Sequence, residues 1–266
     1  MKYAVIFGGA SGLAQASIDE LLKKDFVVFA CDLAFKEAKK EGSLHSLPCD
    51  ITNEASIKEV KKYVLKFTDK IDVLSNFVGI VTLGSLIELP TNTLDKILAI
   101  NVLGTYKTNA IFFDLVKNAN GRIINISSEY AKICGIPFHG YYGISKHALD
   151  IYNESLRREL AGSGVKVICI RPGAFKTKMQ AGVTNQFENV VSNTKLYKKQ
   201  LTKMSGLMTS ELDKAKPAEI FGKKFAKIAT KKHPRRVYKI NNSFKMKMLS
   251  ALPTGVQDLA FKMFMK

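Results

Sequence analysis

The sequence offers little support for a secreted, membrane-spanning or metal-binding protein. Its four cysteines are widely separated and none forms a C-x-x-C pair: Cys31, Cys49, Cys134 and Cys169. We therefore expect buried thiols in a reducing cytoplasm and no metal site. The apolar run at residues 3–7 ends in glycines and is too short for a signal peptide or a membrane span, so we expect a cytoplasmic protein that begins at Met1.

Acidic residues are scarce, above all near the C-terminus. The chain has 41 Lys and Arg against 23 Asp and Glu, a net charge of +18, and residues 196–266 alone carry 17 against 4. Such an excess is typical of proteins that bind nucleic acid or an anionic membrane, and also of a lysine-rich solvated surface. The basic residues are scattered between apolar ones, without a nucleic-acid-binding motif, so we expect no nucleic-acid partner.

Continuous apolar runs alternate with helical patterns along the chain. Runs rich in Val, Ile and Phe predict strands at residues 3–7, 26–31, 44–49, 72–77, 122–127, 165–170 and 236–240. The segments between them predict helices at residues 13–24, 54–67, 93–117, 142–161 and 218–230. Strands that are apolar throughout indicate a parallel sheet covered by helices on both faces. We predict an α/β fold, a doubly wound parallel sheet of about seven strands, in a single domain that spans residues 1–266.

Two segments stand outside this alternation. Residues 175–216 are long, polar and lysine-rich with weak periodicity, and we expect a loop that serves as a substrate-binding lid. Residues 241–266 form a basic amphipathic tail in which Phe, Met and Leu recur with lysines at near-helical spacing. Such a tail suits a membrane-surface helix, a flap over the protein's own substrate pocket, or a contact with a second subunit.

The turn after the first predicted strand is rich in glycine. Gly8, Gly12 and Ala14 are spaced as G-x-x-x-G-x-A, with Ser11 and Leu13 in the same turn. Glycines let the backbone turn tightly and approach a pyrophosphate, and the following helix offers free N–H groups to the phosphates. This turn predicts a dinucleotide site.

Acidic residues follow the second and third predicted strands. Asp32 can accept hydrogen bonds from both ribose hydroxyls and would repel a 2′-phosphate, which favours NAD over NADP. A helix-capping role for Asp32 before Ala34 is the alternative. Asp50 and Ile51 are placed to meet an adenine ring, and N-capping by Asp50 or Thr52 is the competing interpretation.

The segment YGISK places Tyr142 and Lys146 four residues apart at the start of an amphipathic helix. That spacing puts both side chains on one face, where the ammonium favours the ionised phenol. Bringing a phenol from a pKa of about 10 to about 7 requires roughly 4 kcal/mol. The pair is therefore a candidate proton-transfer site.

Together these motifs resemble the short-chain dehydrogenases/reductases, NAD(P)-dependent oxidoreductases built on a Rossmann sheet. The resemblance runs from Lys2 to about Thr177. The family's glycine motif falls on residues 7–14, with Phe7 in place of threonine and Ala14 in place of the third glycine. Its N-N-A-G motif falls on Asn76, Phe77, Val78 and Gly79.

The resemblance implies four catalytic residues: Asn101, Ser128, Tyr142 and Lys146. In the family the tyrosine exchanges a proton with the substrate, the lysine lowers the tyrosine pKa and bonds the nicotinamide ribose, and the serine holds the substrate oxygen. The asparagine anchors a water that connects the lysine to solvent. A structural role for Asn101, capping a break in the long predicted helix, is compatible with this one.

The same resemblance implies the residues that bind the dinucleotide, including a Pro-Gly-Thr segment that holds the nicotinamide carboxamide. The predicted set is Gly8, Ser11, Gly12, Leu13, Asp32, Asp50, Ile51, Asn76, Val78, Gly79, Tyr142, Lys146, Pro172, Gly173, Phe175 and Thr177.

The spacing of the catalytic residues departs from the family by one position. Ser128 and Tyr142 are 14 residues apart, one more than usual, and Tyr141 would restore the spacing without the lysine partner. We keep Tyr142, place the extra residue in the loop 134–139, and prefer Ser128 to Ser127. His139 is interpreted as a loop residue.

The resemblance extends to substrate and assembly. LRREL at 156–160, the lid and the basic C-terminal segment are similar to members that act on steroids, retinoids and other lipophilic alcohols. We predict an NAD-dependent enzyme that interconverts a secondary alcohol and a ketone, such as a hydroxysteroid, in a homodimer or homotetramer. The alternatives are a reductase of a smaller carbonyl or 3-oxoacyl substrate, and a dinucleotide-sensing regulatory protein.

Overall fold

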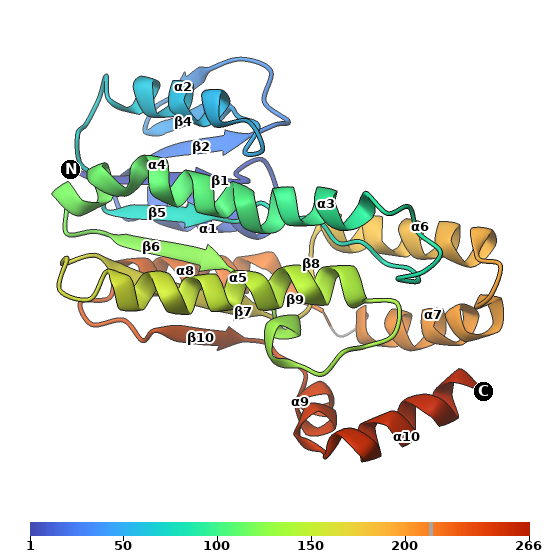
Figure 1. Ribbon diagram of the computed structural model, residues 1–266. Helices are drawn as coiled ribbons and strands as arrows, with labels where there is room; N and C mark the ends of the chain where they lie inside the picture. The colour runs from blue at the N-terminus through green and yellow to red at the C-terminus, as the bar shows by residue number, and fades with distance from the viewer. Residues whose placement is uncertain (213–214) are drawn as a thin grey trace.

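A mostly parallel sheet of eight strands runs through the centre of the computed structural model, which describes residues 1–212 and 215–266 (Figure 1). At 178–181, 184, 205 and 207–212 only the backbone is described. The strand order is β10-β7-β6-β5-β1-β2-β4-β3. The bounds are β1 Lys2–Phe7, β2 Phe26–Asp32, β3 Lys39–Glu41, β4 Leu44–Pro48, β5 Val73–Asn76, β6 Arg122–Ile126, β7 Lys166–Pro172 and β10 Val237–Ile240.

All seven predicted strands are present, and the doubly wound α/β fold is confirmed. The additional strand β3 pairs antiparallel with β4 at the sheet edge, joined by a turn in which Gly42 has φ 59°. Its three residues, Lys-Lys-Glu, are all exposed. An exposed charged edge strand has no apolar periodicity, so the sequence pattern could not reveal it.

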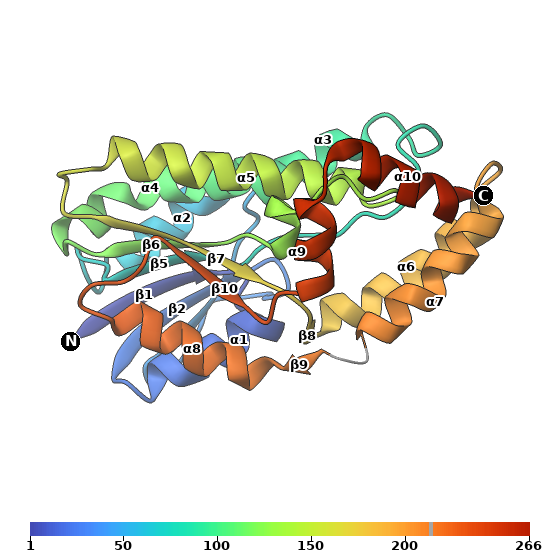
Figure 2. The ribbon, with the colours of Figure 1, turned by 90° about the horizontal axis from the view of Figure 1, so that it is seen from below.

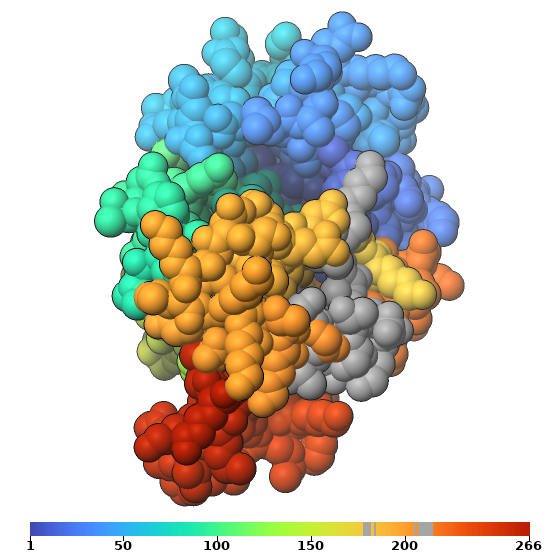
Figure 3. Space-filling view, turned by 90° about the vertical axis from the view of Figure 1, so that its right-hand side faces the viewer, coloured from blue at the N-terminus to red at the C-terminus, as the bar shows by residue number. Residues whose placement is uncertain are grey.

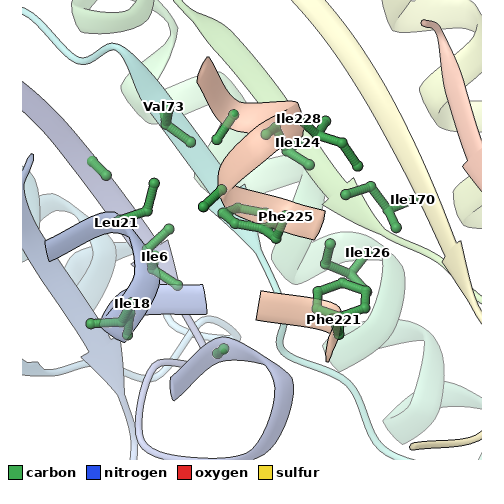
Figure 4. Packing of buried hydrophobic residues seen from close by; sticks show 14 of the residues in the cluster. Ile6, Ile18, Leu21, Val73, Ile124, Ile126, Ile170, Phe221, Phe225 and Ile228 are labelled. Atoms are coloured by element: carbon green, nitrogen blue, oxygen red, sulfur yellow. The ribbon is translucent and has the colours of Figure 1, made fainter. Parts of the chain in front are cut away.

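Helices cover both faces of the sheet (Figure 2). On one face lie α1 (Gly12–Leu22) and α8 (Ala218–Thr230), and on the other lie α2 (Glu54–Val64), α4 (Thr105–Asn118) and α5 (Gly140–Glu159). Buried apolar side chains fill each layer, because alternate residues of a strand point to opposite faces. The first layer contains Ile6, Ile18, Leu21, Ile124, Phe221 and Phe225 (Figure 4), and the second contains Val5, Phe7, Phe29, Leu74 and Phe112.

The long helix predicted at residues 93–117 is interrupted. It consists of α3 (Thr93–Leu98), a π-helical turn η1 (Ala99–Gly104) and α4. Asn101 lies in this turn. Single π-turns inside α-helices are frequent at functional sites, since the wider turn re-aims a side chain.

The loop expected at 175–216 is largely helical. Short strands β8 (Phe175–Lys176) and β9 (Lys216–Pro217) pair at its base, and α6 (Lys178–Asn193) and α7 (Lys198–Leu212) lie between them. Residues 213 and 214 of this predicted lid lie outside the described residues. The two helices pack on the rest of the protein through a third apolar cluster, formed by Val183, Phe187, Leu201 and Met204 with Leu83 and Phe138. This contact stabilises helices that the sequence pattern indicates only weakly.

The tail forms two helices, α9 (Phe244–Ala251) and α10 (Thr254–Met265). In Figures 1 and 2 they extend from the end of β10 toward α7. Every helix in the described part of the chain is too short or too polar to cross a bilayer.

Candidate active site

A cavity of about 650 Å³ lies where the parallel strands end. Figure 3 looks onto this side of the molecule, with α6 and α7 (orange) in front and the tail helices (red) below. The cavity is lined by the glycine turn and by the ends of strands β2, β5, β6 and β7. Residues from the helices α5, α6, α7, α9 and α10 complete the lining. This is the crevice in which doubly wound sheets bind their ligands.

The glycine turn is shaped for close approach of backbone to a ligand. Gly8 has φ 85°, and a Cβ there would lie 2.8 Å from the backbone nitrogen of Val78. Gly12 has φ 61° and begins α1, and Ser11, Gly12 and Leu13 all line the cavity. The first turn of α1, which is fully described, has no acidic side chain. Its N–H groups and positive dipole end fit a pyrophosphate.

Asp32 lies at the cavity wall and ties the glycine turn to the end of β2. Its Oδ2 accepts a hydrogen bond from the backbone N–H of Ala10 at 3.1 Å, and its Oδ1 accepts one from Ala34 at 2.9 Å. The bond to Ala34 closes a turn, and the helix that Asp32 would cap in the alternative interpretation is absent, because residues 33–38 form no helix. Each carboxylate oxygen retains a further lone pair, so the geometry also suits a ribose diol.

Two of the predicted adenine contacts do not line the cavity. Asp50 Oδ1 accepts hydrogen bonds from the Thr52 backbone N–H (2.8 Å) and hydroxyl (2.7 Å), which closes the turn before α2. Ile51 is buried in the core beneath Gly104, where a Cβ would lie 2.4 Å from the Ile51 side chain. The structure gives Asp50 a turn-forming role and Ile51 a packing role.

Asn76, a further predicted cofactor contact, also points away from the cavity. Its Nδ2 donates to Asn109 Oδ1 and Asn125 Oδ1, each at 2.8 Å, and its Oδ1 accepts from the Thr108 hydroxyl at 2.7 Å. These buried side chains join β5 and β6 to α4. A fully bonded polar network of this kind holds the strand end in place.

Residues from the other strand ends do line the cavity, among them Val78, Gly79, Pro172, Gly173, Phe175 and Thr177. A Cβ on Gly173 would lie 2.0 Å from the Asn241 carbonyl oxygen, so only glycine fits between β7 and the chain after β10. These predicted cofactor residues are therefore assembled around one space.

Tyr142 and Lys146 lie together on α5 and face the cavity. The Lys146 Nζ lies 5.7 Å from the centre of the Tyr142 ring and donates a hydrogen bond to the Ile126 carbonyl at 3.3 Å. Burial lowers the pKa of Lys146 to about 8. Burial raises the pKa of Tyr142 to about 12, with a hydrogen bond to Ser128 acting in the opposite direction. At neutral pH the pair thus consists of an ammonium and a protonated phenol.

The two candidate serines have different surroundings. Ser128 is close enough to the Tyr142 phenol to act against the rise of its pKa, and the Ser128 Oγ accepts a hydrogen bond from the Tyr130 backbone N–H at 3.2 Å. The Ser127 Oγ is buried and has no hydrogen-bond partner among the described residues. The structure therefore brings Ser128, and not Ser127, against the tyrosine despite the unusual spacing.

Asn101 acts as a clamp behind these residues. Its Oδ1 accepts from the Ile80 backbone N–H at 2.8 Å, and its Nδ2 donates to the Ile80 carbonyl at 2.9 Å and to the Ser145 hydroxyl at 3.0 Å. A Cβ on Gly79 would lie 3.4 Å from both Asn101 Oδ1 and Lys146 Nζ. The π-turn thus places the amide beside the lysine and fixes the loop after β5.

Several site residues escaped the sequence interpretation. His139 is buried and stacks on Tyr130 with ring centres 5.3 Å apart, and Tyr130 meets Tyr142 edge-on at 5.5 Å. Burial lowers the pKa of His139. The sequence did offer one indication that His139 lies at the site, because it stands only three residues before Tyr142. Four residues of α9 and α10 also line the cavity, which agrees with the flap interpretation of the tail although no individual residue was predicted: Met246, Leu249, Phe261 and Phe264.

The chain's similarity to known proteins covers most of its length. The family model for short chain dehydrogenase matches residues 2–188. An NADPH-dependent 3-dehydrocapnine reductase of Ornithobacterium rhinotracheale is 32% identical over 191 residues, covering 67% of each chain. The 17-beta-hydroxysteroid dehydrogenase type 6 of Rattus norvegicus is 32% identical over 187 residues, 67% of this chain and 58% of the relative.

The fold is likewise similar to solved structures. A short chain dehydrogenase/reductase from Burkholderia phymatum in complex with NAD has a TM-score of 0.75 and 20% identity, covering 97% of this chain and 95% of that one. Among the side chains that the structure describes, His, Cys, Asp and Glu form no group of three that could hold a metal ion.

Proposed function

Because this chain belongs to the short-chain dehydrogenase/reductase family, we propose that it interconverts a lipophilic secondary alcohol and its ketone, with NAD as the preferred cofactor. The family establishes an oxidoreductase that acts on alcohol and carbonyl groups with a nicotinamide dinucleotide. The observation that carries the finer proposal is one cavity whose lining includes the glycine turn, Tyr142 and Lys146, and many apolar side chains.

Tyr142 carries the proton in the proposed mechanism. In reduction its protonated phenol donates to the substrate oxygen, and in oxidation its phenolate takes the proton of the alcohol. A bound nicotinamide ring supplies or accepts the hydride. Ser128, hydrogen-bonded to Tyr142, holds the substrate oxygen where negative charge develops. Lys146 lowers the cost of the phenolate, and Asn101 positions the loop beside that lysine.

The cofactor preference rests on Asp32. Its carboxylate faces the cavity at the end of β2, where it would accept hydrogen bonds from a ribose diol and repel a 2′-phosphate. The 32%-identical 3-dehydrocapnine reductase is NADPH-dependent, whereas the Burkholderia structure contains NAD. The proposal for this chain therefore depends on the carboxylate itself.

The substrate proposal rests on the apolar lining of the cavity. This lining includes Val81, Leu83, Ile136, Val183 and Met204, with Met246, Leu249, Phe261 and Phe264 from the tail. Apolar walls with a few polar groups at one end fit a bulky lipophilic molecule that carries a single reacting oxygen, such as a hydroxysteroid. A reductase of a smaller carbonyl is the second candidate, and a Tyr142 that is protonated at neutral pH favours the reduction direction for a substrate of either size.

The proposed assembly is a homodimer or homotetramer. Exposed apolar side chains lie along the helices that carry the catalytic residues: Leu103, Tyr106, Ile144 and Ile151. Pairing of these helices with those of a second copy would cover them. Light scattering on purified protein gives the subunit number.

The test of the function is the absorbance at 340 nm when purified protein receives NAD or NADP with hydroxysteroids, retinol and simple secondary alcohols. We expect activity with NAD on a lipophilic alcohol that Tyr142→Phe abolishes, while NADH fluorescence shows that the variant still binds cofactor. Turnover that survives in Tyr142→Phe would contradict the mechanism. Binding of NADH without turnover of any alcohol or ketone would favour the regulatory alternative.

A further inference from the structure

The tail helices α9 and α10 are apolar on two sides. One side lines the cavity through Met246 and Leu249 on α9 and Phe261 and Phe264 on α10. Each of these pairs is separated by three residues, the spacing of one helix face. The tail therefore serves as a wall of the proposed substrate site, as the flap interpretation of the sequence expected.

The other side of the tail is exposed. Phe244 and Met248 on α9 and Leu252 at its C-cap recur every four residues, and Val256, Leu259 and Met263 follow at spacings of three and four on α10. These six side chains, here called the stripe, are 71, 55, 41, 47, 60 and 68% exposed, respectively. A helix that is apolar on two sides needs a partner on each, and a series of exposed apolar side chains of this kind marks an interaction surface.

Hydrogen bonds hold this surface in place at both ends. The Cys134 backbone N–H donates to Ser250 Oγ on α9 at 2.8 Å. Gln200 Nε2 and Lys199 Nζ on α7 donate to the carbonyls of Met265 (2.8 Å) and Lys266 (3.1 Å). The stripe thus belongs to a folded part of the molecule, tied to the proposed lid.

The surroundings of the stripe are strongly basic. The tail carries one acidic residue, Asp258, and four exposed lysines: Lys245, Lys247, Lys262 and Lys266. Two more exposed lysines, Lys199 and Lys203, lie on α7, which is bonded to the end of the tail. Apolar side chains flanked by lysines are the pattern of helices that lie in the interface of an anionic bilayer.

We propose that α9 and α10 dock on an anionic lipid bilayer, with the stripe inserted among the headgroups. The inner side of the same helices then delivers a membrane-dissolved substrate to the cavity, a step that rests on the proposed function. A second copy of this chain fits the stripe less well, because a twofold contact would set the lysines of one tail against those of the other.

The first test is co-sedimentation of the full-length Tyr142→Phe protein with vesicles, which separates docking from catalysis. We expect binding to vesicles of phosphatidylglycerol and phosphatidylcholine, weaker binding to phosphatidylcholine alone, and loss of binding as salt is raised. Equal binding to both vesicles, or none to either, would overturn the proposal.

Matched variants separate binding through the stripe from nonspecific adsorption of a basic protein to anionic vesicles. Leu259→Ser and Lys262→Glu should each weaken binding to the anionic vesicles about fivefold or more. Their controls are Leu65→Ser and Lys62→Glu on the exposed surface of α2, which should bind like the parent. If the tail variants instead change only the subunit number in light scattering, the stripe is a contact between copies of the chain and the proposal is wrong.

Kinetics of the wild-type enzyme connect docking to substrate delivery. Leu259→Ser should slow turnover of a steroid or retinoid presented in anionic vesicles and leave turnover of a short water-soluble alcohol unchanged. Turnover of the soluble alcohol without vesicle binding would refute docking and keep the proposed function. Vesicle binding without turnover of either substrate would support docking and refute the proposed function.

Discussion

Replacing Lys146 by methionine should stabilise the ligand-free protein at neutral pH, although it removes the group that assists Tyr142. Lys146 is 4% exposed, and burial lowers its pKa from 10.5 to about 8. That difference corresponds to about 3 kcal/mol of unfavourable free energy for keeping the ammonium buried below pH 8. The hydrogen bond to Ile126 offsets about 1 kcal/mol, so methionine should raise the free energy of unfolding by about 2 kcal/mol.

The sign of the pH dependence follows from the same two pKa values. Between about pH 8 and 10.5 the unfolded lysine holds a proton that the folded lysine has lost, so the wild type gains stability as the pH rises through this window. The methionine variant lacks this contribution. Its advantage should therefore be complete below pH 8 and shrink toward pH 10.5.

Guanidinium unfolding of both proteins at pH 7 and pH 10 measures the effect, because the difference between the two curves cancels the titration of every other group. A variant that is less stable than the wild type at pH 7, or an advantage that is the same at both pH values, would refute the reasoning.

The same variant should lose activity in the oxidation direction. The Lys146 ammonium lies 5.7 Å from the centre of the Tyr142 ring, and an opposite charge within about 4–6 Å favours the ionised form of a group by about one to three pKa units. We expect kcat/KM for alcohol oxidation to fall about a hundredfold at neutral pH and the pH profile to shift to higher pH. A uniform loss without that shift would mean that Lys146 acts only in binding the cofactor.

Three further predictions address the cofactor site and the core. Asp32→Ala should raise the ratio of kcat/KM for NADP to that for NAD about tenfold or more, since it removes the charge that repels a 2′-phosphate; an unchanged ratio would show that Asp32 only ties the glycine turn. Gly8→Ala should weaken NADH binding and cost more stability than Gly42→Ala, because both have positive φ but only Gly8 would place a Cβ against backbone, at 2.8 Å; equal effects on melting and NADH fluorescence would contradict this. Asp150→Ala should cost about 3–5 kcal/mol in denaturant unfolding, because it leaves Arg171, bonded to it at 2.7 and 2.8 Å, largely buried and without that carboxylate; a cost under about 1 kcal/mol would show that the pair is solvent-screened.

Local sequence was sufficient where a residue's role depends on its neighbours along the chain. The glycines after β1 need positive φ, and Tyr142 and Lys146 are one helical turn apart, so both motifs could be identified from spacing. Continuous apolar runs likewise identified seven strands, because a strand buried on both faces needs no alternation.

Side-chain direction at the strand ends could not be predicted in the same way. Asn76 is the last residue of a correctly placed strand, yet its amide bonds to Asn109 and Asn125 and does not reach the cavity. Whether the Asn76 side chain points into the cavity or into the core depends on hydrogen-bond partners from α4 and β6, which are distant in the sequence.

The helices of the lid could not be predicted for the same reason, since they depend on contacts with distant segments. The helices of residues 178–212 were not apparent from periodicity, because their apolar contacts come from Leu83, Phe138 and the tail. Packing of this kind, more than intrinsic propensity, stabilises short helices.

The sequence by itself determined the family and the doubly wound sheet and predicted the proton-transfer pair, since each depends on local patterns: apolar runs, the glycine turn and the spacing of Tyr142 and Lys146. Only the tertiary structure decided which serine meets Tyr142, that Asn101 clamps the loop after β5, and that the tail closes the cavity with one side and exposes a lysine-flanked apolar stripe on the other. These features depend on contacts between distant segments, whose geometry is set by packing rather than by local spacing.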